Sequence, residues 1–286
     1  MNMTRIVVGV DGSDPSNAAT QWAAREAQQT GATLSLVHAF DWDYYGARFD
    51  GGTVLREWAE DKANTTLAGA AALAAAVAPT VIVSRKSVLG SPVPVLLDAA
   101  TDASMIVVGN RGRGGFGSLL LGSAGQRLAT HAPVPVVVVR GRPDIGSGAV
   151  VVGVDGSPSS LDALAAGFRE AASRSARLIA VRAYVPPTPP WGVNVEPVVY
   201  DVAERDAELH AELDEQLGPW REKFPDVAAE KLVAHGGVAG VLVGLSHTAQ
   251  LVVVGTRGHG SVAGTVTGSV GLQLVHHADC PVLIVR

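Results

Sequence analysis

The sequence predicts an α/β protein made of two tandem doubly wound domains, each a five-stranded parallel sheet with helices on both faces. The chain has 286 residues, enough for two domains of ordinary size. It repeats itself once, with IVVGVDGS at 6–13 and VVVGVDGS at 150–157. Within each copy, short β-branched runs alternate with helical patterns, which is typical of this fold class.

The repeat extends well beyond its first strand. ATLSLVHAF (32–40) lies over ARLIAVRAY (176–184) at an offset of 144 residues. MIVVGNRGRGG (105–115) lies over LVVVGTRGHGS (251–261) at an offset of 146, which the last strands keep. A unit of this length is a whole domain and not a solenoid repeat.

Domain boundaries follow from the repeat. The segment 141–148, GRPDIGSG, has the Gly, Pro and Ser content of a linker. We therefore predict one domain over residues 1–142 and a second over residues 148–286.

The elements of the first copy can be placed from the pattern. Strands are predicted at 5–10, 33–39, 80–84, 104–108 and 135–139. Helices are predicted at 16–29 and 53–77, from Ser91-Pro92, and from Gly122-Ser123. Because connections between parallel strands are right-handed, the chain order gives the strand order 3-2-1-4-5. Ligands of such sheets bind at the carboxyl ends of the strands, here between the first and fourth strands.

Composition limits the function. The net charge of −5 lacks the basic footprint of a nucleic-acid-binding protein. Cys280 is the only cysteine, so no internal disulfide is possible, which fits a reducing compartment. The start is not typical of a signal peptide, and no apolar run reaches the ~20 residues that a membrane span needs. We expect a cytoplasmic protein without membrane or nucleic-acid partners.

Two loops meet at the predicted switch point, and the second has a defined glycine spacing. After the fourth strand the sequence reads G-x2-G-x9-G-S, formed by Gly109, Gly112 and Gly122-Ser123. The second copy repeats this spacing with Gly255, Gly258 and Gly268-Ser269. Glycines let backbone N–H groups approach an anion, and a helix N-terminus adds free amides and a positive dipole end. A single such loop would more often be a tight turn, but the repeated spacing favours a phosphate-binding loop.

Other sites are weakly supported or absent from the sequence. It contains neither a G-x4-G-K-[ST] loop nor a G-x-G-x-x-G turn after the first strand. The eight histidines are scattered, so a metal held by protein ligands is not expected. We find no nucleophile elbow, and Ser13 and Ser157 are predicted to cap helices. No catalytic residue is assigned.

The repeated VGVDGS, the LVHA/VRAY pair and the glycine spacing together resemble the universal stress protein family in its tandem, ATP-binding form. The resemblance covers nearly the whole chain and implies ATP as the ligand, possibly with Mg²⁺. It also implies nucleotide contacts by position. In the first copy these fall on Gly9, Val10, Asp11, Ala39, Val108, Gly109, Arg111, Gly112, Gly122, Ser123 and Ala124. In the second copy they fall on Gly153, Val154, Asp155, Ala183, Val254, Gly255, Arg257, Gly258, Gly268, Ser269 and Val270.

The two copies also differ. His259 replaces Arg113, and Gly236-Gly237-Val238 replaces the Gly90-Ser91-Pro92 helix start. These differences could make the two sites unequal. The segments 41–56 and 185–200 differ most, and we interpret them as variable surface loops, with a lid or docking role as the alternative.

Three functions remain open at this point. The first is an ATP-binding regulator of stress response or growth state, acting through ATP-dependent conformation or partner binding. The second is a slow Mg²⁺-dependent ATPase in which Asp11 and Asp155 position the metal and water. The third is an interaction module that binds no nucleotide. Because the last strand of each copy is an apolar edge, we expect these strands to pair domain to domain, and we also expect a homodimer of the chain.

Overall fold

The computed structural model describes residues 4–40, 52–112, 123–142, 147–187, 201–256, 258 and 268–286. The first copy consists of β1 (Arg5–Gly9), α1 (Asp14–Thr30), β2 (Thr33–Phe40), α3 (Gly52–Val77), β3 (Val83–Leu89), α4 (Pro92–Ala99), β4 (Met105–Gly109), α5 (Ser123–His131) and β5 (Val136–Val139). The second consists of β6 (Val150–Gly153), α6 (Pro158–Ser173), β7 (Leu178–Tyr184), α7 (Val202–Lys223), β8 (Ala229–His235), α8 (Val238–Ser246), β9 (Leu251–Gly255), α9 (Ser269–His277) and β10 (Val282–Val285).

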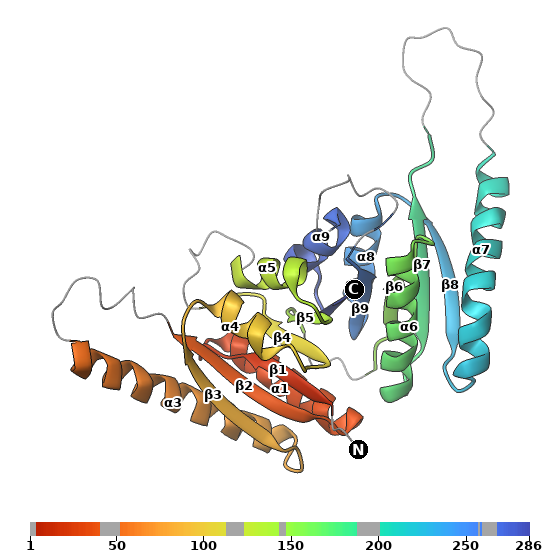
Figure 1. Ribbon diagram of the computed structural model, residues 1–286. Helices are drawn as coiled ribbons and strands as arrows, with labels where there is room; N and C mark the ends of the chain where they lie inside the picture. The colour runs from red at the N-terminus through yellow and green to blue at the C-terminus, as the bar shows by residue number, and fades with distance from the viewer. Residues whose placement is uncertain are drawn as a thin grey trace, which may run out of the picture.

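All ten strands form one sheet, in the order β3-β2-β1-β4-β5-β10-β9-β6-β7-β8. Strands within each copy pair in parallel, whereas β5 and β10 pair antiparallel through Val138 and Val282 (Figure 1). The order 3-2-1-4-5 predicted for each copy is confirmed. The last strands pair copy to copy within one chain, as their apolar edges predicted.

Helices cover both faces of this sheet. On one face α1 and α3 of the first copy and α6 and α7 of the second bury a continuous apolar core. On the other face α4, α5, α8 and α9 bury a second core. The β5–β10 pair contributes side chains to both cores, because successive residues of a strand point to opposite faces. The two copies therefore share their hydrophobic cores across the junction.

An arginine after each of the two central strands, β5 and β10, forms hydrogen bonds to the other copy. The Arg140 guanidinium, just after β5, donates to the carbonyl oxygens of Leu274 (3.3 Å) and Val275 (2.6 Å) in α9. Arg286 occupies the equivalent position after β10, and it donates to the carbonyl oxygen of Thr130 in α5. Each arginine thus binds backbone carbonyls near the C-terminal end of a helix in the other copy, where the helix dipole favours a cation. The junction has pseudo-twofold symmetry.

One predicted strand is displaced. The sequence placed the third strand at 80–84, but β3 runs from Val83 to Leu89. The physical reason is that β3 is an edge strand whose central residues are exposed, so its sequence is polar. The apolar residues Val81 and Val83 that suggested a strand pack against the core at its beginning.

The predicted helix caps are confirmed. The Ser13 hydroxyl accepts a hydrogen bond from the Ser16 amide in α1, and Ser157 accepts from Ser160 in α6. Within the described ranges, no helix is both long and apolar enough to span a bilayer.

Candidate functional site

The first site loop follows β1, and a carboxylate organises it. Asp11 Oδ1 accepts hydrogen bonds from the Ser13 amide (2.9 Å) and the Ser13 hydroxyl (2.6 Å). Gly12 has a left-handed backbone with φ of 77°, which favours glycine. The chain therefore turns sharply from β1 into α1 and leaves the Asp11 carboxylate at the carboxyl end of the sheet.

The second copy builds the same loop. Asp155 Oδ1 accepts from the Ser157 amide at 3.0 Å, and Gly156 has φ of 81°. In both copies the turn also holds the start of the following helix through a serine cap. The aspartates predicted at the two sites thus occupy equivalent positions.

The second loop follows β4 and closes on the first. A Cβ added to Gly109 would lie 2.6 Å from the carbonyl carbon and oxygen of Pro15, in the first turn of α1. A Cβ on Gly112 would lie 2.6 Å from Asp11 Oδ2. The first glycine lets the helix approach the strand, and the second lets the loop approach the carboxylate.

The second copy repeats both close approaches. A Cβ on Gly255 would lie 2.6 Å from the Ser159 carbonyl oxygen, and one on Gly258 would collide with Asp155 Oδ2. The glycines of the motif were predicted to allow close approach of the backbone to a ligand. In the described part of the chain, these four glycines also permit close approach of the protein to itself. In each copy, the loop after the first strand and the glycine loop after the fourth strand therefore lie against each other.

The third part of the motif begins a helix. In the second copy Gly268 is the N-cap of α9, and its amide donates to the Thr256 carbonyl oxygen at 2.6 Å. Because glycine has no side chain, Gly268 gives the first amides of α9, at Ser269 and Val270, no side-chain cap. In the first copy, Ser123 begins α5 and Ala124 follows it. Gly122 and Arg257 lie outside the described residues, as does Arg113.

The remaining predicted contacts lie on neighbouring strands. Val108 and Val254 are buried next to Gly109 and Gly255 at the ends of β4 and β9. Ala39 pairs with Val88 near the end of β2, and Ala183 pairs with Ala234 near the end of β7. Val10 and Val154 are buried directly after β1 and β6. Gly9 and Gly153 end those strands, and Arg111 is exposed beside Gly112.

A side chain of the second strand, which the motifs did not indicate, reaches the first loop in each copy. In the first copy His38 Nδ1 lies 2.5 Å from the Val10 carbonyl oxygen. In the second copy Arg182 donates to the Val154 carbonyl oxygen at 3.3 Å and to Glu212 of α7 at 2.7 Å. The available signal was a basic or ionisable residue at equivalent positions of the second strand in both copies, His38 and Arg182.

A polar cluster beside the second site is replaced by apolar residues at the equivalent described positions of the first. The Tyr184 hydroxyl donates to Asp206 Oδ1 at 2.9 Å, and His235 Nε2 lies 2.9 Å from the same oxygen. The hydrogen bond from His235 is the main cause that lowers the pKa of Asp206. The equivalent positions in the first copy hold Phe40 and Leu89. The outer parts of the two sites therefore differ in polarity.

Metal ligands do not gather around either described site. Where the structure describes the chain, no three or more His, Cys, Asp or Glu side chains lie together in a group that could hold a metal ion.

These features define a class of protein: a tandem pair of doubly wound domains with a doubled loop site at the carboxyl ends of the strands. The model of the universal stress protein family matches residues 2–140 and 147–286. The chain belongs to the universal stress protein family, in its tandem form.

Relatives of the same length support this membership. A universal stress protein of Mycobacterium tuberculosis is 36% identical over 98% of this chain and 96% of its own length. One of Mycolicibacterium smegmatis is 34% identical over 98% of this chain and 96% of its own length. The crystal structure of a universal stress protein from Archaeoglobus fulgidus has a TM-score of 0.74 at 16% identity, covering 100% of this chain and 99% of its own. Because the sequence identity is this low, the structural similarity supports the shared fold and no shared function.

Proposed function

We propose that each copy binds ATP across its two site loops, and that the protein acts as a regulator of stress response or growth state. In this proposal ATP binding changes the conformation of the chain or its affinity for a partner. One observation carries the proposal: the same two-loop geometry, with a carboxylate against a glycine, is built twice from sequences that have otherwise diverged.

The chemistry of the loops supports a nucleotide. Asp11 and Asp155 lie at the carboxyl ends of β1 and β6, and a carboxylate oxygen can accept more than one hydrogen bond, so each can also accept from a ribose hydroxyl. The amides at the start of α9, and those at the start of α5, suit the phosphates. The tandem, ATP-binding form of the family that the sequence resembles has the same glycine spacing.

The first experiment identifies the ligand directly. Freshly purified protein is denatured, and the released small molecules are identified and counted by mass spectrometry. We expect ATP, at up to two equivalents for each chain. Release of no nucleotide, together with no heat of ATP binding by calorimetry, would contradict the proposal.

The second experiment separates the two sites. Gly112→Ala and Gly258→Ala each place a methyl group against the site carboxylate, and we expect each to weaken ATP binding at its own site at least tenfold, or about 1.4 kcal/mol. Gly69→Ala and Gly244→Ala are the matched controls, because an added Cβ there meets nothing within 4 Å. Equal affinities in all four variants would count against the assigned loops.

Hydrolysis is tested in the same preparations. As a regulator the protein should release phosphate from ATP no faster than buffer does. Release that disappears in the Asp11→Ala, Asp155→Ala double variant would instead support the slow ATPase.

A homodimer of the whole chain is also proposed, on a surface other than the last strands. Both edges of β5 and of β10 are already paired within the chain, so these strands have no free edge for a second copy. Light scattering coupled to gel filtration should give a mass near 59 kDa, about twice the 29.3 kDa of one chain.

A further inference from the structure

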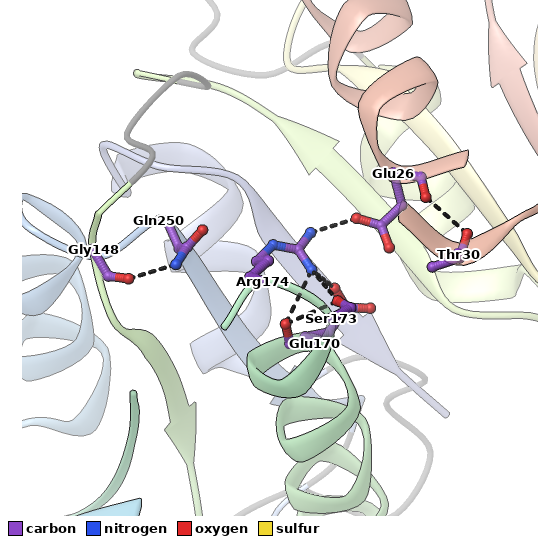
Figure 2. Close-up of polar contacts among 7 residues, drawn as sticks. All are labelled: Glu26, Thr30, Gly148, Glu170, Ser173, Arg174 and Gln250. Carbon is purple, nitrogen blue, oxygen red and sulfur yellow. Dashed lines mark hydrogen bonds and ion pairs between the residues drawn. The ribbon is translucent and has the colours of Figure 1, made fainter. Parts of the chain in front are cut away.

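A cluster of three buried charges lies between the two copies. Glu26 is in the last turns of α1, whereas Glu170 and Arg174 belong to the end of α6 and the residue that follows it. Arg174 Nη2 donates to Glu26 Oε2 at 2.5 Å, and Nη1 donates to Glu170 (Figure 2). The side chains of Glu26, Glu170 and Arg174 are only 2%, 12% and 8% exposed. This contact joins the copies on the face of the sheet that carries α1 and α6.

The two copies contribute equivalent acidic residues to the cluster, but only the second copy contributes a basic one. Glu26 and Glu170 are equivalent residues at the offset of 144. The equivalent of Arg174 in the first copy is Thr30, whose hydroxyl donates to the Glu26 carbonyl oxygen at 2.7 Å. Two carboxylates therefore share one guanidinium, and the fully ionised cluster has an excess negative charge. The Trp22 ring, 5.6 Å from the guanidinium carbon, adds an apolar wall.

One oxygen of the cluster is buried without a hydrogen-bond partner among the residues that the structure describes. This oxygen is Glu26 Oε1. An unpaired buried carboxylate oxygen is costly when ionised, and a proton removes most of that cost. Burial and the neighbouring Glu170 raise the pKa of Glu26 to about 7, although Arg174 acts in the opposite direction. Among the described residues, the charges that act on Glu26 are those of Glu170, in α6, and Arg174, directly after α6.

We propose that the two copies are docked around a buried proton site formed by Glu26, Glu170 and Arg174, and that loss of the proton weakens their contact. The proton is held on Glu26, while Arg174 remains paired with Glu170. Deprotonation leaves two carboxylates around one guanidinium in an apolar junction. Because α1 and α6 begin at the two site loops, this junction joins the helices that carry those loops.

Linkage fixes the sign of the effect. The pKa of Glu26 is raised from 4.5 to about 7, so the folded state holds a proton that the unfolded state has lost between these values. The contribution of Glu26 to stability is therefore fully present below pH 4.5 and is lost as the pH rises through about 7. Within this window, each pH unit increases the unfolding constant up to about tenfold.

The test compares wild-type protein with Glu26→Gln, which mimics the protonated side chain. Urea unfolding of nucleotide-free protein is measured from pH 5 to pH 8. We expect the ratio of the wild-type to the variant unfolding constant to rise by more than tenfold across this range. Glu230→Gln is the control, because it removes a carboxylate from an exposed pair with Arg177 and should leave the ratio unchanged. A ratio for Glu26→Gln that does not vary with pH would overturn the proposal.

A second measurement uses the wild-type protein and does not depend on whether the variant folds. Infrared spectroscopy should show a buried protonated carboxyl at pH 6 that disappears as the pH passes neutrality. No such band at pH 6 would overturn the proton site. Hydrogen exchange then tests the docking: segments 24–30 and 170–178 should lose protection at pH 8 relative to Glu26→Gln, whereas the edge strand 83–89 should not. Equal protection in both proteins would overturn the docking role.

Discussion

Gly109→Ala separates the structural role of the glycine motif from its role in binding. The added Cβ would lie 2.6 Å from the Pro15 carbonyl carbon and oxygen and 2.9 Å from the Pro15 Cβ, where ordinary contacts begin at 3.4 Å. The obstacle is backbone in the first turn of α1, so relief requires a shift of the helix or of β4. Overpacking of this kind costs about 1–3 kcal/mol, and we expect a value near the upper end.

The assay is urea denaturation with Gly69→Ala as the matched control. Gly69 lies inside α3 with open space around it, so alanine there should stabilise the protein by about 0.5–1 kcal/mol. Gly109→Ala should instead unfold at a clearly lower urea concentration. Gly112→Ala should bind ATP weakly while unfolding close to wild type, because only a side-chain carboxylate has to move. An unchanged midpoint for Gly109→Ala would refute the steric argument.

Two further predictions concern the core. Phe168 is fully buried and stacks on Trp220 and Phe224 at ring-centroid distances of 6.1 and 5.9 Å. Phe168→Ala should therefore lower the free energy of unfolding in urea by about 3–5 kcal/mol, and Phe168→Leu by less than about 1.5 kcal/mol. Similar losses in both variants would contradict the packing. Burial raises the pKa of the Cys280 thiol to about 12, so a thiol reagent at pH 8 should label the protein only in denaturant, and rapid labelling of the folded protein would contradict this.

The parts of the fold that sequence predicted well are those whose pattern is set locally. β1, β4 and β5 are apolar on both faces because helices cover them on both sides, and right-handed connections between alternating strands and helices predicted the strand order. The caps at Ser13 and Ser157 were predictable for the same reason, because a cap acts within its own turn. Apolar edges on β5 and β10 also predicted their pairing, which satisfies both edges at once.

The parts that sequence missed depend on contacts between distant segments. β3 lies at the edge of the sheet, so its exposed residues gave no strand pattern, and the neighbouring apolar residues drew the prediction three residues too early. The Glu26–Arg174 contact joins residues 148 positions apart, and the repeat could not reveal it because the first copy has threonine in place of Arg174. Likewise, nothing in the motif required His38 and Arg182 to reach the first loop.

Comparison of equivalent residues locates the asymmetry between the two sites. The glycine pairs at 109 and 255, and at 112 and 258, meet equivalent groups in each copy, so this part of the two proposed sites is built alike. The copies differ on the side of the second and third strands, where Tyr184 and His235 replace Phe40 and Leu89. This difference lies at the end of each proposed site that would contact the base. We therefore expect nucleosides, which lack phosphate, to distinguish the two copies.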